Sequence, residues 1–215
     1  FNTEKSDIMN EKACFIFAAG SYYDDPICPN KGDLVIAADA GFLQAKKRNI
    51  PLSLAIGDMD SLQNAPDFAN AIILPSEKDD TDTLAAIRVG LEKGYRLFHI
   101  YGGTGGERFD HTLANIQCLA FLSKKGARGY LYGKNQIITA ITDGSISFLR
   151  GKSGFISVFS LDGIAEGVTE KGLKYTLDKA QLKNDFPIGV SNRFLPNEEC
   201  FISVEKGTLI IVYPK

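Results

Sequence analysis

The sequence contains no tryptophan, and only two histidines and two methionines occur among its 215 residues. The histidines, His99 and His111, are too few and too far apart to form a histidine-based metal site. The four cysteines form no CxxC pair, and their spacing matches no zinc-binding pattern. Oxygen ligands must therefore hold any metal. Together with the lack of a signal-peptide pattern, this cysteine usage predicts a cytoplasmic protein.

The chain also lacks an excess of charge of one sign. Lys and Arg total 24 against 26 Asp and Glu, which gives a net charge of -2. No basic stripe is visible, so we expect no nucleic-acid partner. No apolar run approaches the roughly 20 residues of a membrane span, so we expect no membrane partner either. The apolar fraction of 44% suits a globular protein with a buried core.

In the first part of the chain, short apolar runs alternate with helical patterns. Such runs, when continuous rather than alternating, are typical of a parallel sheet that is covered on both faces. We therefore predict a mostly parallel sheet with helices on both faces. The expected strands are Cys14–Ala19, Leu34–Ala38, Leu52–Ile56, Ala71–Leu74, Leu97–Tyr101 and Tyr130–Tyr132, and the expected helices are Gly41–Asn49, Thr81–Lys93 and Asp110–Lys125.

The pattern changes near residue 135, after which no helical periodicity is found. Short apolar runs separated by Gly or Asp-Gly predict an antiparallel β-sandwich or jelly roll. We expect strands over 137–142, 146–149, 155–161, 173–177, 200–204 and 208–213, with a hairpin turn at Lys206 and Gly207. The predicted domains are 1–134, with 1–12 a frayed end, and 135–215.

Acidic residues follow several of the expected parallel strands. Asp39 follows the second strand, Asp58 and Asp60 follow the third, and Asp82 follows the fourth. The carboxyl ends of parallel strands share one edge, where ligands bind. A cation must neutralise so many acids, and carboxylate oxygens suit magnesium. A single aspartate in such a loop can simply cap a helix, but capping does not require the D-x-D spacing.

The fifth strand is followed by GGTGGERFDH, which has four glycines in five positions. Such a loop allows close backbone approach to a phosphate. Arg108 supplies a forked cation for phosphate oxygens, and Asp110 stands at the start of the following helix. The loop is neither a dinucleotide fingerprint nor a P-loop. Because His99 has apolar neighbours, we interpret it as a core residue. Ser191 and Asn192, taken alone, are typical of a loop hydrogen bond.

Five segments in this order resemble the thiamin pyrophosphokinase family: GDMDS, DDTD, GGTGGERFDHTLAN, GKSGFISV and GVSNRF. The resemblance extends from about Val35 to the C-terminus. It implies an α/β nucleotide-binding domain followed by a β-sandwich, in a homodimer with the active site near the subunit interface. The implied reaction converts ATP and thiamin into thiamin diphosphate and AMP.

The resemblance also implies roles for individual residues. Asp58, Asp60 and Asp82 would be catalytic and would hold Mg²⁺, with Asp39 as a further ligand. Residues of the DDTD segment, the glycine-rich loop and the SN pair would bind the two substrates. On the ATP side these are Gly103, Arg108, Asp110, His111 and Thr81, and on the thiamin side Ser191, Asn192 and Lys78.

The sequence departs from the family pattern at two informative positions. Leu84 stands where bacterial members often carry Glu, and Tyr175 stands where some members carry Trp. Two other functions stay open, and Leu84 is a hint toward the second of them. One is a magnesium-dependent nucleotide-sugar transferase that uses the D-x-D motif, and the other is a catalytically silent sensor of thiamin or nucleotide. Formation of AMP in step with loss of thiamin separates all three.

Overall fold

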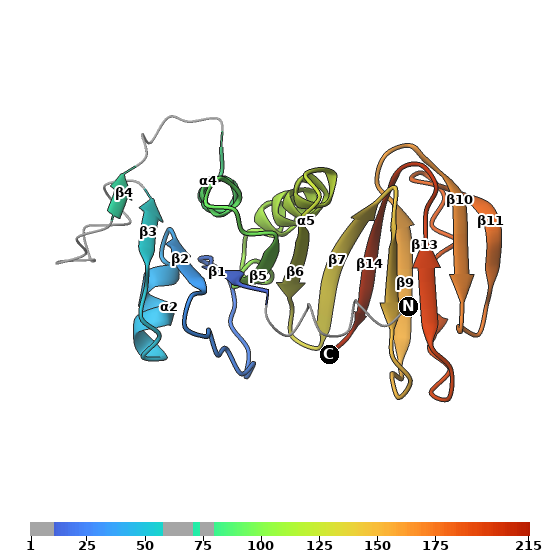
Figure 1. Ribbon diagram of the computed structural model, residues 1–215, viewed down its shortest axis with the longest axis horizontal. Helices are drawn as coiled ribbons and strands as arrows, with labels where there is room; N and C mark the ends of the chain where they lie inside the picture. Colours follow the sequence, from blue (N-terminus) through green and yellow to red (C-terminus); the bar gives the residue numbers. More distant parts are fainter. Residues whose placement is uncertain (1–10, 58–70, 74–79) are drawn as a thin grey trace. The chain divides into compact units, whose positions relative to one another are not determined.

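The computed structural model describes residues 11–57, 71–73 and 80–215, which form two compact units (Figure 1). The first unit comprises Phe1–Cys118 and Leu131–Gly133, and the second comprises Leu119–Tyr130 and Lys134–Lys215. Strand β6 (Arg128–Tyr132) is divided between them.

The first unit is built on a parallel sheet in which the strands follow the order β5-β1-β2-β3-β4. All of the pairings within this set are parallel. These strands consist of short apolar runs, as the sequence predicted, and those of β1 and β2 are buried throughout. Their bounds are β1 Ala13–Phe17, β2 Leu34–Ala38, β3 Leu54–Gly57, β4 Ala71–Ile73 and β5 Leu97–Tyr101.

Helices cover both faces of this sheet. Phe15 and Phe17 of β1 lie in one buried cluster with Ala45 of helix α2 (Gly41–Lys47). Successive strand residues point to opposite faces, so Cys14 lies on the other side. There it contacts Gly90 of helix α4 (Asp82–Glu92), where an added Cβ would come within 3.1 Å of the Cys14 sulfur. The predicted parallel sheet with helices on both faces is confirmed.

His99 of β5 is a satisfied core histidine, as predicted. Its Nδ1 lies 2.8 Å from the hydroxyl of Tyr132. The ring of Tyr132 in turn stacks on that of Tyr101, with centroids 4.3 Å apart. Burial lowers the pKa of His99, which favours the neutral imidazole in this aromatic cluster.

The second unit contains two antiparallel sheets, with strand orders β12-β9-β14-β7 and β11-β10-β13-β8. Inward side chains from both sheets form one buried cluster, which includes Val158, Val168 and Ile202. The predicted antiparallel β-sandwich is therefore confirmed. The strands are β7 Gln136–Thr142, β8 Ser145–Phe148, β9 Phe155–Ser160, β10 Ile164–Lys171, β11 Leu177–Lys183, β12 Asn192–Arg193, β13 Cys200–Ser203 and β14 Thr208–Pro214.

Two local predictions in this unit are wrong. Lys206 and Gly207 do not form a hairpin, because β13 pairs with β10 and β8, whereas β14 pairs with β7 and β9. The turn carries the chain from one sheet to the other, and Gly207 adopts a φ of 114° there. The expected strand over 173–177 is also misplaced, since β11 begins only at Leu177.

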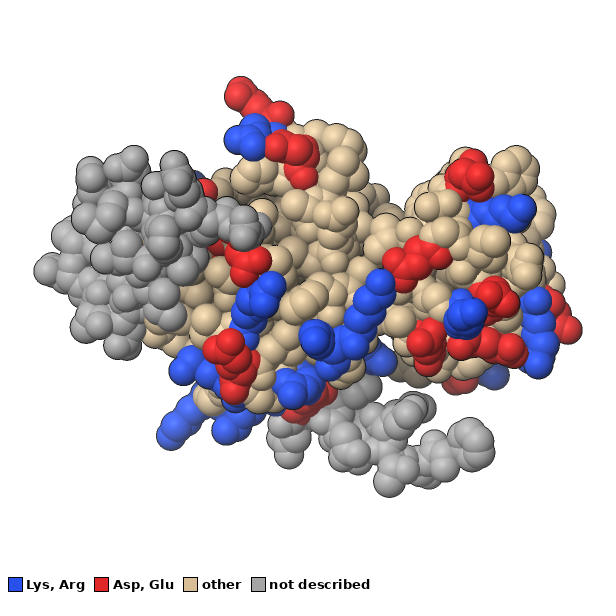
Figure 2. Space-filling view, turned by 90° about the horizontal axis from the view of Figure 1, so that it is seen from above, with Lys and Arg blue, Asp and Glu red and all other residues tan. Residues whose placement is uncertain are grey.

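Charged side chains of both signs are interspersed over the face drawn in Figure 2. Within the described ranges, none of the helices combines the length and the apolar character needed to cross a membrane.

Candidate functional site

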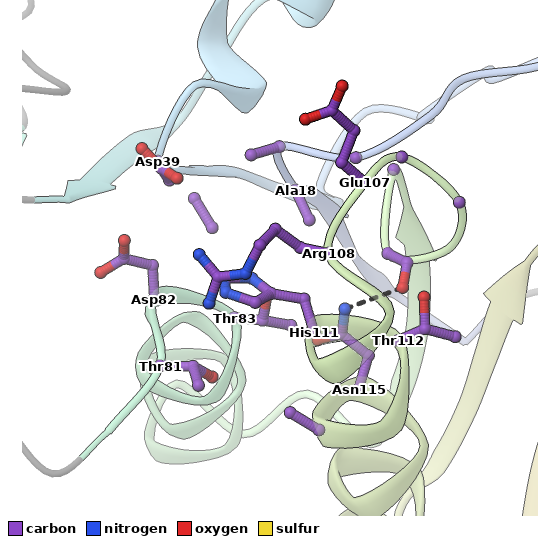
Figure 3. Close-up of a pocket in the computed structure, with 18 residues that line it drawn as sticks. Ala18, Asp39, Thr81, Asp82, Thr83, Glu107, Arg108, His111, Thr112 and Asn115 are labelled. Carbon is purple, nitrogen blue, oxygen red and sulfur yellow. Dashed lines mark hydrogen bonds between the residues drawn. The ribbon is translucent and has the colours of Figure 1, made fainter.

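A pocket of about 380 Å³ opens at the carboxyl edge of the parallel sheet in the first unit. It is lined by the segments that follow β1, β2 and β5, and by the starts of helices α4 and α5 (Phe109–Lys124) (Figure 3). This is the edge at which open parallel sheets bind ligands.

Two backbone segments that line the pocket are in close contact. The amide of Gly20 donates a hydrogen bond of 2.6 Å to the carbonyl of Gly102. A Cβ at Gly20 would lie only 2.5 Å from that carbonyl oxygen, so no larger residue fits. Gly102, Gly105 and Gly106 all have positive φ values, between 68° and 80°. The glycine-rich loop therefore turns sharply and leaves its backbone accessible to a ligand.

Asn115, a buried residue of α5, fixes this loop from the helix side. Its Nδ2 donates a hydrogen bond of 2.8 Å to the carbonyl of Gly103, drawn as a dashed line in Figure 3. A Cβ at Gly103 would contact both Asn115 and Leu131. Asn115 ends the segment GGTGGERFDHTLAN, but no role was predicted for it from the sequence.

The N-terminus of α4 forms one wall. Thr81 is its N-cap, and its hydroxyl accepts a hydrogen bond of 3.2 Å from the amide of Leu84. Asp82 lies in the first turn and lines the pocket, whereas Asp80 pairs with Arg88 at 2.9 Å and does not. Thr81 is therefore the residue that caps α4, and Asp82 lines the pocket.

Asp39 lines the pocket from the loop after β2. It adopts a left-handed φ of 54°, and its amide donates a hydrogen bond of 2.8 Å to the carbonyl of Ile56. In Figure 3 the carboxylates of Asp39 and Asp82 lie on one side of the pocket, and Arg108 and His111 reach in from the other.

Arg108 is oriented by Asp110. The guanidinium Nε and Nη2 donate to the Asp110 carboxylate, at 3.0 and 2.7 Å. This hydrogen-bonded contact lowers the pKa of Asp110 to about 2 and raises the pKa of Arg108. Both side chains are exposed, so the pair contributes little to stability and mainly limits the conformations of Arg108.

In the second unit, Asn192 is buried and fully hydrogen-bonded. Its Oδ1 accepts from the amides of Tyr175 and Arg193, and its Nδ2 donates to the Tyr175 carbonyl and to Glu170. The preceding Ser191 is exposed in a left-handed conformation with φ 60°, and its amide donates to the Ser157 hydroxyl. Asn192 thus makes the loop hydrogen bond that is typical of Ser191 and Asn192 when the two residues are taken alone.

Glu170 is a second residue that our sequence reasoning did not single out. Only 2% of its surface is exposed, and burial raises the pKa of its carboxyl. One carboxylate oxygen accepts from Asn192 at 2.9 Å, while the other has no hydrogen-bond partner within the described ranges. No pattern in the sequence distinguishes it from the solvent-facing acids.

Two family models match the chain in sequence order. Residues 28–131 match the thiamin pyrophosphokinase catalytic domain, and residues 145–209 match the thiamin pyrophosphokinase vitamin B1 binding domain. The chain belongs to the thiamin pyrophosphokinase family.

Individual thiamin pyrophosphokinases resemble the chain over nearly its whole length. A thiamine pyrophosphokinase of Bacillus subtilis (strain 168) is 29% identical over 186 residues, which are 83% of this chain and 86% of that protein. A crystal structure of thiamine pyrophosphokinase from Bacillus subtilis aligns with a TM-score of 0.79 and 27% identity, covering 95% of this chain and 99% of that one. A thiamin pyrophosphokinase family protein from Enterococcus faecalis aligns with a TM-score of 0.79, 26% identity and the same coverage.

Apart from Ala18, Ala19 and Gly20, the residues that line the pocket lie in the part matched by the thiamin pyrophosphokinase catalytic domain, and they include most of the described residues predicted on the ATP side. Asp110 does not line it but holds Arg108. Asp58, Asp60 and Lys78 lie outside the described residues. Within 11–57, 71–73 and 80–215, no three His, Cys, Asp or Glu side chains cluster as a metal site would require. The predicted residues brought together are Asp39, Thr81, Asp82, Gly103, Arg108 and His111.

Proposed function

We propose that this protein transfers the terminal diphosphoryl group of ATP to the hydroxyl of thiamin, giving thiamin diphosphate and AMP. The observation that carries the proposal is the pocket, which combines a glycine-rich loop, two helix N-termini and two aspartates. It lies in a chain that matches both domains of the thiamin pyrophosphokinase family in order.

The pocket is suited to hold a polyphosphate. Backbone N–H groups at the starts of α4 and α5 lack intrahelical partners and favour anions, as do the amides of a glycine-rich loop. Because Asp110 holds the Nε and Nη2 edge of Arg108, the Nη1 edge is the one presented to phosphate oxygens. Thr81, Gly103 and His111 complete the ATP side of this proposal.

In the proposed reaction, the thiamin hydroxyl oxygen forms a bond to the β-phosphorus of ATP. The bond from that phosphorus to the oxygen bridging it to the α-phosphorus breaks, and AMP leaves. Catalysis then depends on holding the phosphates and the alcohol in line and on neutralising charge. Asp82 and Asp60 are the two candidates to accept the hydroxyl proton.

We further propose that Asp39, Asp58, Asp60 and Asp82 hold Mg²⁺. Asp39 and Asp82 support this assignment, because two half-buried carboxylates from different loops line one pocket and supply the hard oxygen donors that magnesium prefers. When bound, the ion would neutralise phosphate charge. We expect Asp58→Asn to lower turnover by orders of magnitude while the protein stays folded.

The remaining proposals concern the second substrate and the setting. Ser191, Asn192 and Lys78 are proposed to belong to the thiamin-binding side of the site. The proposed domains are 1–134 and 135–215. We also propose a homodimer whose active site lies near the subunit interface. A cytoplasmic location is supported by four free cysteines, of which Cys28 is exposed.

One incubation tests the reaction. The purified protein is mixed with ATP, Mg²⁺ and thiamin, and the products are separated by chromatography. We expect equal amounts of AMP and thiamin diphosphate. Formation of ADP with thiamin monophosphate would contradict diphosphoryl transfer, and persistence of thiamin would favour the silent sensor. Parallel incubation with a nucleotide sugar tests the transferase alternative.

Two neighbouring acids provide a matched test of the site. Asp82→Asn removes a carboxylate that lines the pocket, and we expect turnover to fall by at least about tenfold. Asp80→Asn makes the same change two residues earlier, where the carboxylate pairs with Arg88 outside the pocket. This control should keep turnover within about twofold of the unmodified protein. Equal losses in both variants would contradict the assignment of Asp82.

A further inference from the structure

A chain of hydrogen bonds links strand β10 to the loop 172–176. Glu170 of β10 accepts a bond of 2.9 Å from Asn192 Nδ2, and the same nitrogen donates to the Tyr175 carbonyl at 2.7 Å. Asn192 Oδ1 accepts from the Tyr175 amide at 3.0 Å. One side-chain amide therefore holds both backbone polar groups of Tyr175.

The hydrogen-bonding capacity of Asn192 is used up within the chain. An amide side chain has two N–H donors and an oxygen with two lone pairs. Nδ2 serves Glu170 and Tyr175, while Oδ1 serves Tyr175 and Arg193, at 2.9 Å for the last. Asn192 is only 6% exposed. Its side chain is thus suited to hold the loop in place.

Glu170 is an unusual choice for a purely structural position. It points into the sandwich on a strand whose other inward residues, Ala165 and Val168, are apolar. Its Oε1 has no partner in the described part of the chain. Such an unmatched buried oxygen destabilises the folded state and calls for an explanation other than packing.

The loop held by this chain presents an aromatic ring. Tyr175 is 61% exposed, and the Lys174 ammonium lies 5.2 Å from its ring centroid. The loop is anchored before Tyr175, because Leu173 pairs with Phe194 and the Lys174 amide donates to the Arg193 carbonyl. It is anchored after Tyr175 by the pairing of Leu177 with Glu170. A flat, exposed side chain on a fixed loop is suited to contact an aromatic substrate.

We propose that Glu170 is a positioning residue for thiamin binding, which acts by fixing the Asn192 amide and, through it, the loop that carries Tyr175. The inference rests on the proposed function, because the loop belongs to the segment that matches the vitamin B1 binding domain. Glu170 itself does not touch the substrate.

Glu170→Leu and Glu170→Gln separate the hydrogen bond from the volume of the side chain. Leu cannot accept the Asn192 bond, whereas Gln keeps a carbonyl oxygen of the same reach. We measure backbone amide hydrogen exchange at Tyr175, together with steady-state kinetics for thiamin and for ATP. For Glu170→Leu we expect exchange and the KM for thiamin each to rise about tenfold, with kcat and the KM for ATP unchanged. Glu170→Gln should match the unmodified protein in every measurement.

The outcomes distinguish the positioning role of Glu170 from the proposed function. Unchanged exchange in Glu170→Leu would overturn the positioning role, and faster exchange with an unchanged KM for thiamin would overturn the link to substrate. A fall in kcat alone would indicate a merely structural residue. If the unmodified protein makes no thiamin diphosphate, the proposed function fails, and the exchange data still decide whether Glu170 holds the loop. Should Glu170→Leu not fold, Glu170→Met offers an unbranched side chain of similar length.

Discussion

Arg108, Asp110 and Asn115 lie within eight residues of one another, yet they act on the pocket in different ways. Arg108 reaches into the pocket and is oriented by Asp110 at its surface. Asn115 acts from the interior, through a carbonyl of the glycine-rich loop. A surface contact and a buried one respond differently to substitution, because only the buried partner is left without water when its bond is lost.

We expect Asn115→Asp to weaken ATP binding. The acid has nearly the same shape, but its carboxylate cannot donate to the Gly103 carbonyl and would repel it. Leaving this buried carbonyl unmatched should cost about 1–3 kcal/mol. The KM for ATP should rise about tenfold or more, and the free energy of unfolding measured in urea should fall.

Gln117→Glu is the matched control, since it makes the same chemical change at an exposed position of the same helix. Its KM for ATP should stay within about twofold of the unmodified value. If both variants shift the KM equally, added negative charge rather than the loss of the Gly103 bond is responsible.

The contact between Arg108 and Asp110 predicts a lowered pKa for the Asp110 carboxyl. NMR should give Asp110 a pKa of about 2, because the Arg108 guanidinium donates to the charged form. A lowered pKa means that the pair's small contribution to stability is present above about pH 4, the ordinary range of Asp, and is lost as the pH falls toward 2. In Arg108→Gln the Asp110 pKa should return toward the ordinary range. A pKa that stays near 2 there would assign the shift to the backbone at the start of α5 instead.

The pocket is built where helices α4 and α5 begin. The first turn of α4 contributes Asp82 to it, while Thr81 caps the helix. A loose cap would displace the Asp82 carboxylate, so helix stability and site geometry are connected at this point.

Thr81→Ala removes the hydroxyl that accepts the Leu84 amide, and we expect it to destabilise the protein by about 1 kcal/mol. Thr81→Ser keeps the hydroxyl and should keep most of the stability. Urea denaturation of the three proteins checks this expectation. Equal stability of Thr81→Ala and the unmodified protein would show that the cap does not contribute.

Much of the arrangement of elements could be predicted because parallel strands share one edge. The positions of Asp39 and Asp82, and that of the glycine-rich loop, followed from where the apolar runs end. The bond from Asn115 to Gly103 could not be predicted, since it joins residues 12 apart through a contact that leaves no periodic signal. Strand β10 was missed because Gly167 interrupts it and Glu170 replaces an apolar inward residue.

The two compact units divide the residues of the candidate sites between them. The candidate pocket belongs entirely to the first unit, and the Glu170–Asn192–Tyr175 network belongs entirely to the second. The composition and the change of pattern near residue 135 predicted an α/β part and a sandwich. The turn at Lys206 and Gly207 was misread because a local reversal signal does not say to which sheet the next strand belongs.

A mixing experiment tests the proposed dimer. Asp82→Asn damages the ATP side, and Asn192→Asp damages the thiamin side by removing both Nδ2 donors. If each active site takes these sides from different subunits, half of a randomised dimer population is mixed, and each mixed dimer has one intact site. The mixture should then recover about a quarter of the unmodified activity.

The control is each variant re-equilibrated alone, which should keep the low activity that it had before. No recovery in a mixture that sedimentation velocity shows to be dimeric would place both sides of the site in one subunit. A monomer in sedimentation velocity would contradict the dimer itself.

The glycine-rich loop contains two kinds of glycine, with different consequences for how this pocket can change. A Cβ at Gly102 would lie 2.4 Å from the Tyr22 ring and 2.5 Å from the Ala18 carbonyl oxygen, so no replacement is accommodated. Gly106 has a similar φ of 80° but nothing within 4 Å of such a Cβ. Asparagine, which tolerates this backbone conformation, fits there. Position 106 is therefore where a library of variants can add new side chains to the lining of the candidate pocket without loss of folding.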